Sequence, residues 1–167
     1  DNNTYKVFQY IIDNPKHDLH LNITSNMCPP DPKLKAKYFN MLQTICLQQK
    51  VEQVMQFVSV DAWGTRAEYI RHGLDFNYMM DNVEEFLDRI PGRNSITFIC
   101  TYNNLSITSM DKLLETILEL RKTYSKTHHR VWCDVPLLRQ PAWPQITLLP
   151  ESYQALHEAN IEYMQKH

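Results

Sequence analysis

The feature that most constrains the fold is a repeated alternation of short apolar segments with longer amphipathic ones. The short segments have the two-residue period of β-strands and occupy residues 19–26, 55–61, 95–103 and 130–136. Apolar residues recur at helical spacing around and between them, in residues 4–13, 32–45, 67–72, 77–90, 110–124 and from 150 onward. Strands that alternate with helices over such connections predict right-handed βαβ units and a parallel sheet.

Helix boundaries are marked by residues with well-understood local chemistry. Asp31 followed by Pro32 is typical of an N-cap and a first-turn proline. Pro91-Gly92 is expected to end the helix that precedes it. Thr108 and Ser109 are expected to cap the helix of residues 110–124.

Each expected strand has one apolar face and one mixed face, which is unusual for a sheet with helices on both sides. The mixed face carries His20, Asn22, Thr24, Asn26, Ser59, Asp61, Thr101, Asn103 and Asp134. One layer of helices outside and a polar concave face inside would satisfy this pattern. We therefore expect a single α/β domain over residues 1–167, folded as a partial (β/α) barrel fragment with about four parallel strands and helices on the outer face.

Composition excludes several classes of function. The net charge is −2 over 167 residues, so nothing indicates electrostatic binding to nucleic acid or to an anionic membrane. No apolar run reaches the roughly 20 residues that span a bilayer, and no secretory signal is visible. The four cysteines lack metal-ligand spacing and are expected to be reduced thiols of a cytoplasmic protein. With three glycines, the chain has no glycine-rich phosphate loop.

The strand of residues 55–61 and the turn after it form the first candidate site. Ser59 and Asp61 lie at its expected carboxyl end, and Arg71 follows a few residues beyond the glycine turn. Ligands of parallel α/β folds sit beyond the carboxyl ends of the strands. A hydroxyl, a carboxylate and a guanidinium at such an edge therefore indicate a binding site.

The same residues also have structural interpretations, which the spacing leaves open. Asp61 and Asp134 could cap turns or pair with arginines, and Arg71 could be a solvated helix residue. Asn26 and Asn103 end their strands, where asparagine commonly forms turns.

Several segments resemble radical S-adenosylmethionine (SAM) enzymes. ITSN at residues 23–26 is similar to the Thr-Asn strand end midway through that family, and VSVDAWG at 58–64 resembles its fourth strand. The segment AEYIRHGLDFNYMMDNVEEFL resembles the Tyr-x-Arg-x-Gly and Asn-Val helix that follow. TFICTYNNLSITSMDKLLETILELR and VWCDVPLLRQPAW resemble the fifth and sixth strands of the twitch-domain subgroup. The resemblance covers residues 17–165.

The chain also departs from that family. The Cys-x-x-x-Cys-x-x-Cys signature, the Gly-Gly-Glu segment of the second strand and the cysteine cluster of a twitch domain are all absent from the sequence. The resemblance therefore implies strands three to six of a six-stranded partial barrel, and the opening on Asp1 fits the expectation of a fragment. Its partner would be the missing N-terminal half of the same protein, which would hold the 4Fe-4S cluster.

The resemblance also implies roles for individual residues. Ser59 and Arg71 are expected to contact SAM, with Arg71 near its carboxylate, and Asn26 and Asp61 are expected to face the same cofactor. Asn103 and Asp134 are expected to face the substrate, a small molecule or a peptide that the sequence does not identify, and no residue of this chain is expected to bind metal. With its other half, the protein would cleave SAM to a 5′-deoxyadenosyl radical that abstracts hydrogen from the substrate. Alone, it is expected to be inactive.

Two functions of other classes fit the same residues. The chain could be a non-catalytic β/α module that binds a partner or a small molecule. It could also be a barrel hydrolase or lyase in which Asp61 and Asp134 form an acid–base pair.

Overall fold

The computed structural model describes residues 2–138, 140–142 and 144–166, and it confirms an α/β chain with four parallel strands in one sheet. The strands lie in the order β1-β2-β3-β4, and every neighbouring pair is parallel. The strands are β1 (Lys16–Ser25), β2 (Val51–Ser59), β3 (Ser95–Ile99) and β4 (Val131–Asp134). The α-helices are α1 (Asn2–Asp13), α2 (Pro32–Leu47), α3 (Thr65–Ile70), α4 (Phe76–Arg89), α5 (Met110–Tyr124) and α6 (Gln154–Lys166).

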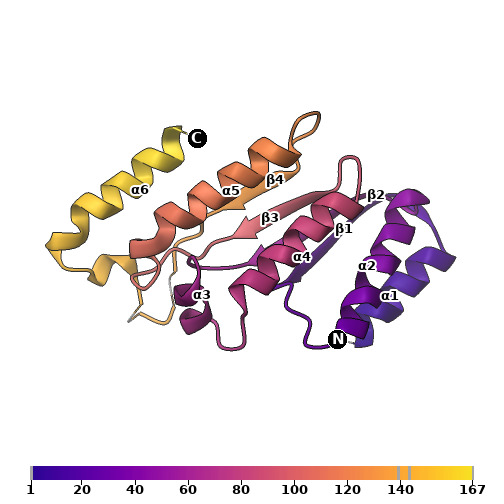
Figure 1. Cartoon of the computed structure of the whole chain (residues 1–167), viewed down its shortest axis with the longest axis horizontal. Helices are drawn as coiled ribbons and strands as arrows, with labels where there is room; N and C mark the ends of the chain where they lie inside the picture. Colours follow the sequence, from indigo (N-terminus) through magenta and orange to yellow (C-terminus); the bar gives the residue numbers. More distant parts are fainter. Residues whose placement is uncertain (1, 139, 143, 167) are drawn as a thin grey trace.

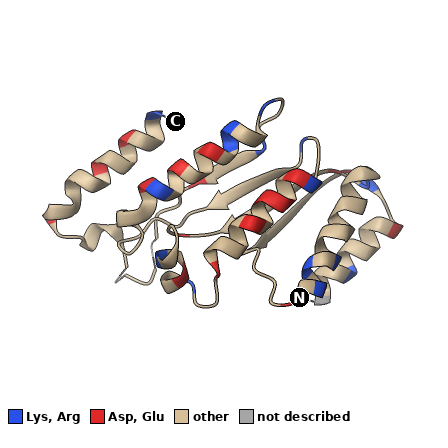
Figure 2. Ribbon diagram, in the orientation of Figure 1, with Lys and Arg blue, Asp and Glu red and all other residues tan. Residues whose placement is uncertain are grey.

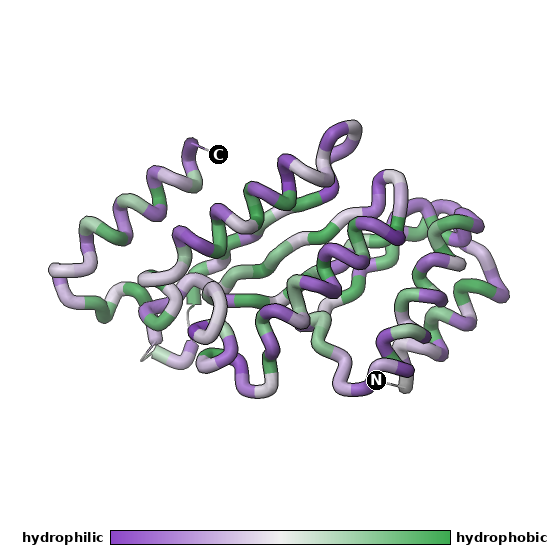
Figure 3. The backbone as a smooth tube through the Cα atoms, viewed as in Figure 1, coloured by the Kyte–Doolittle hydropathy of each residue, from purple (hydrophilic) through white to green (hydrophobic). Residues whose placement is uncertain are grey.

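The helices that contact the sheet lie on one of its faces (Figure 1). α2 contacts β2, α4 contacts β3 and α5 contacts β4, while α1 packs on α2 and α6 on α5. Strands that follow one another across a sheet through right-handed crossovers place their connecting helices on the same side. Hydrophobic residues run along the strands and recur along the helices, as the colours of Figure 3 show. This covered face includes Val54, Val58, Ile96, Phe98 and Val131, all buried.

The opposite face of the sheet, called the open face below, presents the other set of side chains. The register aligns Thr24, Phe57, Thr97 and Trp132 in one row, and Ser59, Ile99 and Asp134 in the next row toward the carboxyl ends. Trp132 is 46% exposed, Thr24 and Asp134 are also exposed, and Phe57 and Ser59 are partly so. Parallel sheets usually have both faces covered. The open face is therefore the unusual surface of this chain.

A buried glutamine ties the first two strands to α2. Gln56 is 0% exposed, although it lies on the covered face among apolar residues. Its Nε2 donates to the Ile23 carbonyl at 3.2 Å and to the Ser25 hydroxyl at 3.1 Å, and its Oε1 accepts from the Tyr38 hydroxyl. Burial raises the pKa of Tyr38, so the phenol keeps the proton that it donates. The amide is thus satisfied in a site without solvent.

Charged residues are distributed along the helices, as the colours of Figure 2 show, and some of their side chains join elements. The Glu85 carboxylate of α4 forms ion pairs with Lys35 of α2 at 2.8 Å and with Arg89 at 2.7 Å. Farther along the sheet, the Arg130 guanidinium donates to the carbonyls of Leu87 at 2.9 Å and of Ile90. These carbonyls belong to the C-terminal end of α4, where unpaired oxygens and the helix dipole favour a cation. The start of β4 is thereby fixed to the end of α4.

Most element boundaries match the sequence analysis, with informative exceptions. β2 begins four residues earlier than expected. β3 ends at Ile99, and beyond it an isolated parallel bridge joins Tyr102 to Leu137 before the chain turns into a hydrogen-bonded loop. The Asp31 cap is confirmed, since its carboxylate accepts from the Lys33 N–H at 2.8 Å. Ser109 is the N-cap residue of α5, as expected, but its hydroxyl makes no capping bond and instead accepts from the Trp63 N–H and donates to the Ser106 carbonyl. Among the described residues, no helix has the length and apolar character needed to cross a membrane.

The turn after β2 depends on glycine. Gly64 has φ 61° and ψ −141° at the start of α3, a conformation that residues with a Cβ rarely adopt. We expect Gly64→Ala to lower the free energy of unfolding by about 1–3 kcal/mol, measured by urea denaturation. Thr65→Ala, at the next and exposed position, is the control and should change it by less than about 0.5 kcal/mol. Equal effects of the two variants would contradict the argument.

Candidate functional site

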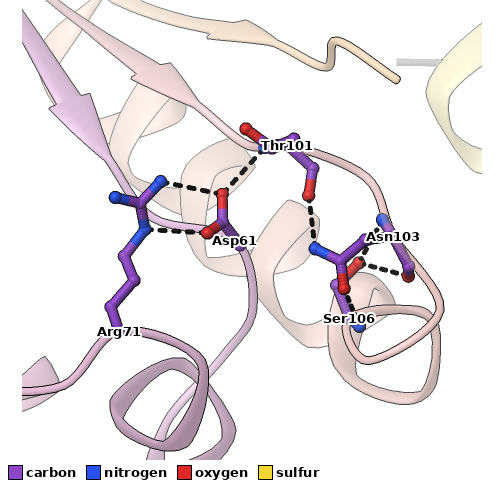
Figure 4. Close-up of polar contacts among 5 residues, drawn as sticks. All are labelled: Asp61, Arg71, Thr101, Asn103 and Ser106. Carbon is purple, nitrogen blue, oxygen red and sulfur yellow. Dashed lines mark hydrogen bonds and ion pairs between the residues drawn. The ribbon is translucent and has the colours of Figure 1, made fainter. Parts of the chain in front are cut away.

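Asp61 connects three elements just beyond the carboxyl end of β2 (Figure 4). Its Oδ2 accepts from Arg71 Nε at 2.8 Å, and its Oδ1 accepts from Arg71 Nη2 at 3.1 Å and from the Thr101 N–H at 3.0 Å. The Asp61 side chain is only 8% exposed. A two-point carboxylate–guanidinium contact fixes both groups in orientation as well as distance. Asp61 therefore holds the end of α3 and the chain after β3 against the end of β2.

Arg71 lies near the carboxyl end of β2 because it directly follows α3, a helix of 6 residues. It is the C-terminal cap residue of α3, and its backbone N–H donates to the Ala67 carbonyl at 2.9 Å. Nε and Nη2 are used by Asp61, whereas Nη1 bonds none of the described residues. The side chain is 34% exposed. Arg71 is thus a fixed cation with one nitrogen available to a ligand.

Asn103 has the structural role that the sequence left open as an alternative. Its side chain is buried, and its Oδ1 accepts from the N–H groups of Leu105 at 2.9 Å and Ser106 at 3.2 Å. Its Nδ2 donates to the Thr101 carbonyl at 2.8 Å (Figure 4). Asparagine commonly forms such turns by bonding the backbone two or three residues ahead. Both groups of the amide are therefore bonded within the loop, which leaves little capacity for a substrate.

The remaining three candidates are accessible. Ser59 and Asp134 lie in one row of the open face with Ile99 between them, which separates their Cα atoms by two strand spacings, about 10 Å. Asn26 follows β1, is exposed, and accepts from the Cys28 N–H at 3.1 Å. The structure thus brings Asp61 and Arg71 into contact and leaves Ser59, Asp134 and Asn26 along the rim of the sheet.

The acid–base pair of the hydrolase interpretation has no support in this geometry. The partners of the Asp61 carboxylate are Arg71 and the backbone of Thr101, and Asp134 is not among them. Both carboxylate oxygens are thus occupied by hydrogen-bond donors of the protein itself. Asp61 therefore acts as a structural anchor.

Sequence reasoning gave too little weight to the apolar part of the open face. Phe57, Ile99 and Trp132 share that face with Ser59 and Asp134. The two-residue alternation that identified the polar residues contains these side chains as well, so the signal was present. Together they would form an apolar wall beside the polar rim, as in most small-molecule sites.

The cysteines do not fit an iron–sulfur cluster. Cys28 follows β1 and Cys46 lies in α2. Cys100 follows β3, Cys133 lies in β4, and their sulfur atoms are 3.8 Å apart. No group of three or more metal-ligating side chains occurs in the described part of the chain. A 4Fe-4S cluster is held by several cysteine thiolates that gather around it. These residues could not hold one.

Comparison of the chain with known protein families, with curated proteins and with solved structures finds no match. The radical SAM resemblance is thus untested by these comparisons and stays a prediction. The geometry of the carboxyl edge of the sheet is the remaining evidence on function.

The ion pair between Asp61 and Arg71 can be measured by a double-mutant cycle. We expect Asp61→Asn and Arg71→Gln to show a coupling energy of about 1–2 kcal/mol in urea denaturation, because the carboxylate is buried while the guanidinium is partly screened by water. Arg66→Gln is the control, since Arg66 bonds the Leu105 carbonyl instead. Its cycle with Asp61→Asn should be additive within about 0.5 kcal/mol. Additivity for both pairs would exclude the ion pair in solution.

Cysteine reactivity tests the electrostatics beneath the open face. The hydrogen bond with Cys100 and the nearby charge of Arg121 lower the pKa of Cys133, whereas burial raises the pKa of Cys46 to about 12. A thiol with a lowered pKa is more ionised at pH 8, and the thiolate is the reactive form. Iodoacetamide should therefore alkylate Cys133 before Cys46, as followed by peptide mass spectrometry. Faster alkylation of Cys46 would contradict this order.

Proposed function

We propose that this chain forms one wall of a radical SAM-type partial β/α barrel and binds SAM at the carboxyl edge of its sheet. The observation that carries the proposal is the open face: a parallel sheet with strands in sequence order, helices on one side, and a mixed polar and apolar surface on the other. In a barrel, such a face lines the interior, where ligands bind near the carboxyl ends of the strands. The sequence resemblance supplies the identity of the ligand.

The chemistry of SAM suits the groups along this edge. Its methionine part carries a carboxylate, and Arg71 offers the Nη1 that Asp61 does not use. Because Asp61 already orients the guanidinium, binding of SAM would cost little additional side-chain entropy. Ser59 offers a hydroxyl for the ribose, and Ile99 and Phe57 offer an apolar surface for the adenine. Asp134, at the far end of the same row, would face the substrate.

The remaining predicted contacts have different weights within this proposal. Asn26 lies on the rim beyond β1 and is accessible to a ligand. Asp61 would act through Arg71 rather than by direct contact, since its oxygens already accept three hydrogen bonds. Asn103 would support the loop instead of binding substrate. The proposal therefore assigns direct contact with SAM chiefly to Arg71 and Ser59.

The 4Fe-4S cluster is not part of this chain's contribution, because its cysteines do not fit one. The polypeptide that holds the cluster would close the barrel over the open face, and the radical chemistry would belong to the cofactors. On its own, this chain binds and orients SAM without cleaving it. The substrate, a small molecule or a peptide, would approach from the side of Asp134.

SAM binding by the isolated chain tests the proposal. In two-dimensional NMR, SAM should shift the amide signals of Ser59, Ile99 and Arg71, and Arg71→Gln should weaken binding about tenfold or more, because a charge-assisted hydrogen bond is lost. Arg71→Lys, which keeps the charge, should recover part of the affinity. Arg66→Gln, on the same helix, should bind as the natural chain does. Each variant is first checked for folding by circular dichroism.

Two results would overturn the proposal. SAM that shifts no signal on the open face, or binds Arg71→Gln and the natural chain equally, would remove the site. A stoichiometric 4Fe-4S cluster formed by this chain with iron and sulfide would show that cluster binding does not need a second half.

A further inference from the structure

A pocket of about 210 Å³ lies at the carboxyl end of β1, among helices α1, α2 and α4. Aromatic and apolar side chains form much of its wall, among them Tyr5, Leu34, Tyr38 and Phe39. Asn82 of α4 lines it as well. Thr24 and Asn26, at the edge of the open face, also line the pocket, but these five residues lie outside the proposed SAM site.

Asn82 is the unusual member of this wall. It is 1% exposed, and its Nδ2 donates to the Met27 carbonyl at 2.7 Å. A carbonyl can only accept, so this bond fixes which end of the amide is nitrogen and which is oxygen. The Oδ1 atom then has no hydrogen-bond partner among the described residues. Buried acceptors without a donor are rare because each one costs free energy.

The two tyrosine hydroxyls of the pocket wall already have partners. The Tyr38 hydroxyl donates to Gln56, and the Tyr5 hydroxyl donates to the Leu34 carbonyl at 3.0 Å. Asn82 Oδ1 differs from these hydroxyls because it is buried and has no partner among the described residues. A ligand that donates one hydrogen bond and otherwise presents apolar surface matches this arrangement.

The wall of the pocket is held in position before any ligand binds. Met27 has φ 52°, a left-handed conformation that residues with side chains seldom adopt. The turn is fixed by bonds from the Met27 N–H to the Ser25 hydroxyl at 3.2 Å and from the Cys28 thiol to the Asp75 carbonyl at 3.3 Å. A strained turn that several contacts hold in place is typical of binding sites, and a fixed wall lowers the entropy cost of binding.

From these observations we infer that the pocket binds a small, flat, aromatic molecule with a single N–H donor. The ring lies against the Tyr38 and Phe39 side, and the donor bonds Asn82 Oδ1. The volume is below the 300–1,000 Å³ of most drug-sized sites, which limits the ligand to one or two fused rings. Asn26 lines this pocket and also belongs to the rim of the proposed SAM site, but the inference rests on Asn82 and the aromatic wall instead.

Indole and benzofuran are the probes, because they have nearly the same shape and differ in that benzofuran has an oxygen where indole has its N–H. Titration of methyl-labelled protein, followed by NMR, should shift Ile23, Met27 and Leu34 with indole. Benzofuran should bind about tenfold more weakly, since it leaves Asn82 Oδ1 without a donor. Leu34→Trp, which places a larger side chain at the pocket wall, should abolish indole binding. Leu47→Trp, an exposed position on the same helix, should not.

Equal affinities for indole and benzofuran would overturn the role of Asn82. Absence of shifts at the pocket methyl groups would overturn the site itself, and so would indole binding that Leu34→Trp leaves unchanged. Folding of both tryptophan variants is verified by their urea transitions, so that lost binding reports on the pocket.

Discussion

The carboxylate of Asp61 is the contact on which the carboxyl edge of the sheet depends. It lies where β2 ends, and it bonds both the arginine after α3 and the backbone after β3. The connection after β2 and the chain after β3 are thereby held together at one point. The position of the Arg71 guanidinium, the cation best placed to receive an anionic ligand there, follows from this ion pair. Structure and proposed function therefore share one interaction at this edge.

The polar residues of the strand ends divide into two groups by their place in the backbone. Those in the loops beyond the strands, such as Asp61 and Asn103, satisfy backbone N–H groups that no ladder reaches. Those within the strands, such as Ser59 and Asp134, are directed by the pleat onto the open face. The second group is the one that remains available to a ligand.

Much of the fold could be predicted from the sequence, because apolar periodicity determines which face of each element is buried. That pattern identified the four strands, their parallel order and the mixed face that includes Ser59 and Asp134. The pattern could not decide whether Asp61 bonds a ligand or Arg71. A carboxylate accepts hydrogen bonds from either, and only the folded structure shows which donor lies close to it. The roles of Gln56 and Asn82 were missed for a related reason. A polar residue in an apolar stripe reveals nothing about partners that come from other elements.

The burial of Gln56 has a consequence for which folds the chain avoids. Its Nε2 donates to Ile23 and Ser25 only when β1 lies beside it in the native register, whereas its bonds with Phe57 and Tyr38 do not involve β1. Sliding β1 by one residue would exchange the two faces of that strand and leave the buried amide with fewer partners. An apolar residue at this position would tolerate such mispaired states more easily. Gln56 therefore disfavours misfolded states, because it increases the free-energy difference between the native strand pairing and mispaired alternatives.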